Sequence, residues 1–350
     1  MAKFPLLLRP PTLAPGSSHY ISNASIIAAR VALGLDDPVR IQFDNLGEGA
    51  KPLANWCRRR QHDEVESMQL RREKKAPFFH QYIAFRLANN EGCFRIDRRQ
   101  LPDEGSPLDC TEEAGVEAYE TIEEINDMEQ SIYSPSEPLV QVDFKSNFRV
   151  ELIIDLCREI SRHERAYMYT VQRYNCYFYA QTLLLCTVCS ENDWYEKYLW
   201  HSCPIEPSDT AYPELLPSTQ YDSAWKVPFR LMVPQRKNSQ PMKEANIGEL
   251  QGYLSEMIRA HAARVEQYKV LLKCNAVEVE QDIKQTMNDI WGRNSLLLGQ
   301  VEEVKAVVSN PVDHRTGHRK PQGLKRRSRV SKKGPDDWVR VPRRGFTTDF

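Results

Sequence analysis

Several familiar sequence signals are missing from this chain of 350 residues, and each absence argues against a class of protein. No stretch approaches the roughly 18 apolar residues that a membrane-spanning helix needs. The Walker loop, the Rossmann glycine run and the G-x-S-x-G motif are absent, which argues against nucleotide hydrolases and serine esterases. Zinc-finger spacing, the homeodomain pattern and RNP motifs are also absent, so base-specific recognition of nucleic acid is not expected.

Cysteine is scarce relative to disulfide-based scaffolds. The chain has nine cysteines, and an odd number leaves at least one unpaired. A secretory signal is not evident, because the short apolar run from Phe4 to Leu8 is soon broken by Arg9 and Pro10. We therefore expect free thiols in a reducing compartment, and a protein that is cytoplasmic or nuclear.

The charge is unevenly distributed along the chain. Residues 311–350 contain twelve Lys or Arg and four Asp or Glu, so the formal net charge of −1 combines a tail of +8 with a body of −9. Within the tail, residues 317–333 (GHRKPQGLKRRSRVSKK) form a basic cluster typical of nuclear import or of binding to nucleic acid. The expected partners are an import receptor or nucleic acid, unless the cluster only solubilises a disordered end.

Local patterns predict a mixture of helices and strands. Residues 58–75 are densely charged and predict a solvated helix. FFHQYIAFRLA (78–88) and CFRIDR (93–98) predict two strands, and NNEG (89–92) between them predicts a turn. Together these segments predict a β-hairpin.

An acidic stretch follows this hairpin. Residues 101–137 contain twelve acidic residues and no Lys or Arg. Apolar residues recur in it every three or four positions, which predicts an amphipathic helix with an acidic outer face. Further patterns predict a strand at 139–144, a helix at 150–163, a strand at 167–171 and a buried helix at 177–188.

The second half of the chain is expected to be mainly helical. Helical spacing returns from about residue 243, as one long helix or a helical hairpin, although His261 and Asn275 fall near the seam that a coiled coil would need. The predicted organisation is an N-terminal extension at 1–76, an α+β core at 77–203, a linker at 204–242, a helical region at 243–310 and a basic disordered tail at 311–350.

An Asn-Cys pair at the start of the buried helix is the clearest candidate for chemistry. Unpaired N–H groups and the helix dipole favour a thiolate at Cys176, and Asn175 is a suitable N-cap. A thiolate nucleophile needs a base, and His80 at the start of a strand is the best candidate. Asp97 on the neighbouring strand would orient the imidazole. Core packing of Cys176 and a surface ion pair at Asp97 are the alternatives.

Two further assignments concern the oxyanion and a metal. The backbone N–H of Cys176 is expected to donate to an oxyanion, together with Gln81 or Asn175. Cys186, Cys189, His201 and Cys203 offer four soft ligands, but their spacing is poor for zinc. We therefore expect no metal and no other cofactor.

The order His80, second strand, then Asn175-Cys176-Tyr177-Phe178 resembles the circularly permuted papain-like superfamily, in particular its lecithin:retinol acyltransferase-like and PPPDE groups. The resemblance covers residues 77–200. It implies a papain-like α+β core in which Cys176 is the nucleophile and His80 the base. Such families hydrolyse peptide, isopeptide or thioester bonds, or transfer acyl chains. Tyr177 departs from the pattern, because these groups often have His or a small polar residue after the cysteine.

Two functions follow from these patterns. In the first, the protein is a cysteine hydrolase or acyltransferase that acts through a thioester on an unidentified protein or acyl substrate. In the second, it is a non-catalytic pseudo-enzyme that binds a protein or nucleic acid through its C-terminal helices and basic tail. Proximity of Cys176 and His80 in an open groove would favour the first function, and burial of Cys176 would favour the second.

Overall fold

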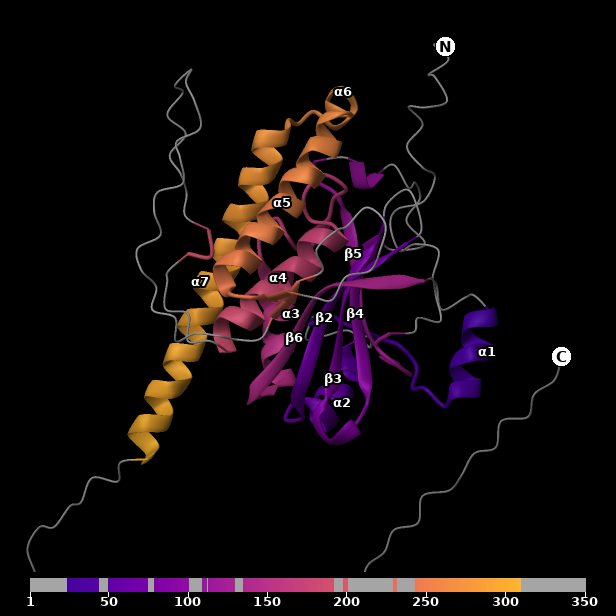
Figure 1. Cartoon of the computed structure of the whole chain (residues 1–350), viewed down its shortest axis with the longest axis vertical. Helices are drawn as coiled ribbons and strands as arrows, with labels where there is room; N and C mark the ends of the chain where they lie inside the picture. The colour runs from indigo at the N-terminus through magenta and orange to yellow at the C-terminus, as the bar shows by residue number, and fades with distance from the viewer. Residues whose placement is uncertain are drawn as a thin grey trace, which may run out of the picture. The chain divides into compact units, whose positions relative to one another are not determined.

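The computed structural model describes residues 24–43, 50–74, 79–100, 109–111, 113–129, 135–191, 198–200, 229–231 and 243–309 (Figure 1). Residues up to Val304 belong to one compact unit, and residues from Lys305 onwards belong to a second. The basic cluster at 317–333 and the predicted disordered tail lie outside the described residues. Among the described helices, none is long and apolar enough to cross a membrane.

An antiparallel sheet forms the centre of the first unit. Its order is β1-β5-β4-β3-β2-β6-β8-β9, with β7 paired to β5. The strands are β1 (Val39–Arg40), β2 (Glu64–Glu73), β3 (Gln81–Leu87), β4 (Cys93–Gln100), β5 (Val116–Ile125), β6 (Ser136–Arg149), β7 (Met168–Tyr169), β8 (Phe229–Leu231) and β9 (Lys243–Ala245). The only described part of the predicted linker, β8, is therefore a strand of this sheet.

Helices pack beside this sheet, which confirms the predicted α+β class (Figure 1). They are α1 (Ala24–Leu33), α2 (Ala50–Arg60), α3 (Val150–Arg162), α4 (Cys176–Glu191), α5 (Ile247–Glu266), α6 (Lys269–Leu272) and α7 (Ala276–Ser309). Two 3-10 turns, η2 (Ala88–Asn90) and η3 (Asp109–Thr111), join strands.

The predicted hairpin is present as β3 and β4. Ile83 pairs with Ile96 and Phe85 with Phe94, so these apolar side chains line one face. The turn between the strands holds two residues of positive φ, Asn89 at 58° and Gly92 at 127°. The second value favours glycine, which explains why the NNEG sequence closes the hairpin.

Two predicted helices are wrong, because both segments contain strands. Part of 58–75 is β2, a central strand between β3 and β6, and the middle of the acidic stretch 101–137 is β5. Charged side chains on these strands are buried against opposite charges: Glu73 pairs with Arg95, and Glu120 with Arg98. The local charge pattern predicted that these side chains are exposed to solvent. In the structure they are buried, and oppositely charged side chains on other strands pair with them.

Helix α4 lies at the centre of the packing. Its residues from Cys176 to Cys189 are all buried, and it packs against β2, β3 and β4 as well as against α3 and α5. Because the helix is enclosed on every side, it needs no polar face, and the sequence is accordingly apolar almost all round. Its N-terminus, where Cys176 lies, is therefore fixed relative to the β3–β4 hairpin.

The C-terminal helices form a hairpin that joins the same core. A capping box between Asn246 and Glu249 begins α5, and α7 runs back along it, with Lys284 donating to Ser255 at 2.8 Å. Leu254 and Ile258 of α5 are buried in the same hydrophobic cluster as the sheet and α4. The sheet and these helices therefore share one core.

Replacing Leu184 in the middle of α4 by Ala is expected to lower the free energy of unfolding by about 3 kcal/mol, because its side chain has no exposed area and would leave a cavity. Leu271→Ala, at a position that is 52% exposed, is the matched control and should change little. Urea denaturation followed by circular dichroism measures both. Equal losses in the two variants would contradict the central packing of α4.

Candidate active site

The Asn-Cys turn has the geometry of a capped helix start. Asn175 Oδ1 accepts from the backbone N–H groups of Tyr177 at 3.0 Å and Phe178 at 3.3 Å, so it is the N-cap of α4. Cys176 is the first residue of the helix, and its own N–H donates to no group among the described residues. The thiol thus lies beside the positive end of the helix dipole, as predicted.

The structure brings His80 and Asp97 together from neighbouring strands. His80 Nε2 lies 3.4 Å from Asp97 Oδ2, and both side chains are buried, with exposed fractions of 2% and 1%. The backbone of the preceding residue, Phe79, has φ of 51°, a region that bulky residues adopt only under strain. This bend lies directly before His80 as the chain enters β3.

A network of charges holds Asp97 in place. Arg95 donates to Oδ2 at 2.7 Å and Arg99 to Oδ1 at 2.6 Å, and the hydroxyl of Thr121 donates to Oδ1 at 3.0 Å. Burial alone would raise the pKa of Asp97, but Arg99 and Arg95, with help from His80, hold it well below its usual range. Asp97 is therefore a permanent carboxylate, which orients the imidazole and does not take its proton.

Cys176 and His80 interact electrostatically. Burial lowers the pKa of His80, but the charge of Cys176 and the hydrogen bond to Asp97 outweigh burial and raise the pKa to about 9. The second ring nitrogen, Nδ1, has no hydrogen-bond partner among the described residues. His80 is therefore an imidazolium at neutral pH and carries a proton that it can pass on.

The two predicted oxyanion donors differ in availability. Asn175 is occupied, because its Oδ1 caps the helix and its Nδ2 donates to the carbonyl of Val171 at 2.9 Å. Gln81 is held by Gln181 of α4, whose Nε2 donates to its Oε1 at 3.0 Å, and its own Nε2 donates to no described group. Nε2 of Gln81 thus has no acceptor among the described residues, whereas Asn175 serves as the helix cap.

Tyr169 was not among the predicted site residues. It precedes the Asn-Cys turn on β7, is fully buried, and its hydroxyl has no hydrogen-bond partner among the described residues. Burial and the charge of Cys176 raise the pKa of this hydroxyl well above its usual range, so it keeps its proton. A buried donor without an acceptor is unusual in proteins and here lies close to the candidate nucleophile.

His261 is the second site residue that sequence patterns did not identify. It lies on α5, and its Nε2 is 2.9 Å from the carbonyl oxygen of Gln172 and 3.1 Å from Nδ2 of Asn175. Because the carbonyl can only accept, Nε2 carries the proton and donates to it. Burial lowers the pKa of His261 to about 4, so it is neutral. No local motif marks this residue, since its partners are more than eighty positions away.

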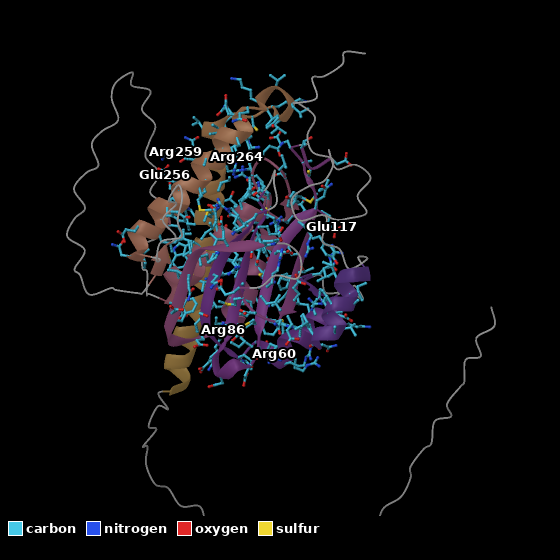
Figure 2. The ribbon with its side chains drawn as sticks, turned by 45° about the vertical axis from the view of Figure 1, so that its right-hand side comes forward. Arg60, Arg86, Glu117, Glu256, Arg259 and Arg264 are labelled. Atoms are coloured by element: carbon cyan, nitrogen blue, oxygen red, sulfur yellow. The ribbon has the colours of Figure 1, made fainter. Side chains whose placement is uncertain are left out.

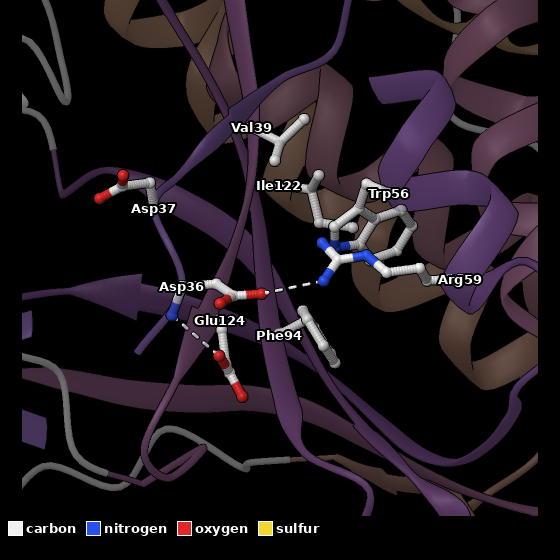
Figure 3. A pocket seen from close by; sticks show the side chains of 8 residues that line it. All are labelled: Asp36, Asp37, Val39, Trp56, Arg59, Phe94, Ile122 and Glu124. Atoms are coloured by element: carbon white, nitrogen blue, oxygen red, sulfur yellow. Dashed lines mark hydrogen bonds and ion pairs between the residues drawn. The ribbon is translucent and has the colours of Figure 1, made fainter. Parts of the chain in front are cut away.

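The candidate residues are enclosed. Cys176 has no exposed area, and Tyr177 beside it is 8% exposed. A pocket of about 210 Å³ lies elsewhere, against Trp56 and Phe94 (Figure 3). Its rim holds an ion pair between Asp36 and Arg59 at 3.5 Å, and none of the three predicted catalytic residues lines it. This pocket is therefore separate from the Cys176 site.

The zinc-type ligand set is not assembled within the described part of the chain. Cys186 and Cys189 are buried in α4, and His201 and Cys203 lie outside the described residues. Where the structure describes side chains, no cluster of His, Cys, Asp and Glu is arranged to hold a metal ion.

Comparisons of the chain with protein-family models, with curated proteins and with solved structures found no match.

The raised pKa of His80 predicts a pH-dependent contribution to stability. The folded state binds this proton more tightly than the unfolded state, so the stabilisation is complete below about pH 6.5 and is lost as the pH rises through about 9. Relative to His80→Gln, the free energy of unfolding of the wild type should fall by on the order of 3 kcal/mol across this interval. Urea denaturation at several pH values measures the difference.

Cys176→Ala is the control for this pH dependence. Removing the thiol removes a principal cause of the raised pKa, so the effect of pH on the His80→Gln comparison should shrink in that background. A dependence that is unchanged without Cys176 would show that the thiol and the imidazole are not coupled.

Proposed function

We propose that the protein is a cysteine-dependent hydrolase or acyltransferase in which Cys176 is the nucleophile, His80 the acid and base, and Asp97 the orienting carboxylate. The observation that carries this proposal is the meeting of all three residues, which lie far apart in sequence, at the start of α4. An ionised Asp97 hydrogen-bonded to His80, with Cys176 interacting with the same imidazole, supplies the groups that nucleophilic cysteine catalysis uses.

The charges define a sequence of steps. The thiolate of Cys176 attacks the carbonyl carbon, and the negative charge on the oxygen is met by the N–H of Cys176 and by Nε2 of Gln81. His80 donates its proton to the leaving group, and a thioester remains on Cys176. His80 then accepts a proton from water or from a second nucleophile, which attacks the thioester and releases the thiolate of Cys176. The steps need no group beyond these residues.

The order of the site residues supports a papain-like core in permuted form. His80 precedes β3, Asp97 lies on the adjacent β4, and Cys176 opens the helix that packs on these strands. We propose this arrangement as the likeness behind the sequence resemblance. It is consistent with cleavage of peptide, isopeptide or thioester bonds and with acyl transfer.

A second candidate function is favoured by one observation, the burial of Cys176. A nucleophile with no exposed area cannot meet a substrate without a local opening of the structure. If the site stays closed, the protein is a non-catalytic relative that retains the residues of an enzyme, and partner binding by its C-terminal helices or basic tail is its role. Reactivity of the thiol separates the two candidates.

The alkylation rate of Cys176 by iodoacetamide, followed from pH 4 to 10 by peptide mass spectrometry, tests the catalytic proposal. We expect Cys176 to react faster than the other eight thiols near neutral pH, because the imidazolium of His80 stabilises its thiolate. His80→Ala should slow this reaction by about 100-fold at pH 7. His62→Ala, at an exposed histidine, is the control and should have no effect.

A Cys176 that resists alkylation, or that reacts equally well without His80, would refute the catalytic proposal and leave the non-catalytic candidate. Asp97→Asn tests the contribution of the carboxylate to His80. It should slow alkylation less than His80→Ala does, because the imidazole remains and only the carboxylate that orients it is lost.

A further inference from the structure

Helix α5 is hydrogen-bonded to the turn that precedes Cys176. The hydrogen bond that Nε2 of His261 donates to the carbonyl of Gln172 at 2.9 Å holds this helix against the residues just before Cys176. The ring of His261 also lies 5.2 Å from the ring of Tyr177, the residue that follows Cys176. Side chains one turn further along α5 are therefore close to Tyr177, the residue that follows Cys176.

Arg264 lies at that position. It is exposed, and its guanidinium lies over the ring of Tyr177, 5.5 Å from the ring centre. Among the described residues it makes no ion pair, in contrast to Arg259 on the same helix, which pairs with Glu256 (Figure 2). The stacking on Tyr177 holds a positive charge one side chain away from Cys176 without a carboxylate to neutralise it.

Arg72 of β2 supplies a second positive charge. Burial and Cys176 raise the pKa of the Tyr177 hydroxyl, whereas Arg264 and Arg72 both act to lower it, so both guanidiniums act on the same phenol. Arg72 already donates from Nε to the carboxylate of Glu137 at 3.1 Å, and Lys74 lies 3.9 Å from that same carboxylate. Arg72 and Lys74 thus share one acidic partner, Glu137, and a planar guanidinium such as that of Arg264 is suited to a carboxylate.

We infer that Arg264, supported by Arg72, binds a carboxylate of the substrate, so that the protein acts on carbonyl compounds with a carboxylate near the carbon that Cys176 attacks. The inference rests on the proposed function and gives it a substrate class. Arg264 would act as a binding residue: it attracts and positions the anionic group, and it takes no part in the transfer of protons.

Two alkylating reagents of similar size test this inference without a known substrate. Iodoacetate carries a carboxylate and iodoacetamide is neutral, so the ratio of their rates at Cys176 measures the attraction of an anion to the site. In the full chain we expect a ratio higher than that of N-acetylcysteine. Arg264→Gln should lower the ratio by about fivefold at low salt, and Arg264→Lys should largely preserve it.

Arg259→Gln is the matched control, because it removes an exposed arginine from the same helix and should leave the ratio unchanged. The iodoacetamide rate alone reports on the integrity of the site in every variant. If iodoacetamide still reacts quickly and in a His80-dependent manner while the ratio is the same in wild type and Arg264→Gln, the carboxylate inference is overturned and the proposed function stands. If Cys176 is inert to both reagents, the proposed function fails and the inference fails with it.

Discussion

The carboxylate of Asp97 is the constraint on which the rest of the site depends. An isolated charge at this depth would be too costly to retain, and two arginines and a threonine hydroxyl compensate for the lost water. With the charge of Asp97 secured, the charge of Cys176 and the hydrogen bond to Asp97 together raise the pKa of His80 to about 9. The buried ion pairs of Asp97 with Arg95 and Arg99 thus fix the carboxylate that contacts His80.

Burial of Cys176, His80 and Asp97 affects both the strength of their interactions and the access of a substrate. Inside the protein, charges interact more strongly than in water, which strengthens the coupling among Cys176, His80 and Asp97. The same enclosure separates the thiol from any substrate, so turnover would need a local opening that costs less than global unfolding.

Sequence patterns predicted the β3–β4 hairpin, helices α3 and α4, and three residues that the structure places together: Cys176, His80 and Asp97. The hairpin is local, and the helix start has a recognisable cap, so both leave short-range signals. The patterns failed for β2 and β5 because the charges there are neutralised across strands, as in the pairing of Glu73 with Arg95. They also missed His261, whose contacts lie in a distant segment and leave no periodic trace.

The contact between α5 and the Asn-Cys turn has a consequence for the timing of assembly. During synthesis, Cys176 leaves the ribosome more than eighty residues before His261, and in that interval the turn lacks the partner that holds it in the native protein. The newly made thiol therefore lacks part of its native surroundings until α5 has been synthesised. A chain that ends before α5 would therefore carry the Asn-Cys turn without the hydrogen bond that His261 makes to it.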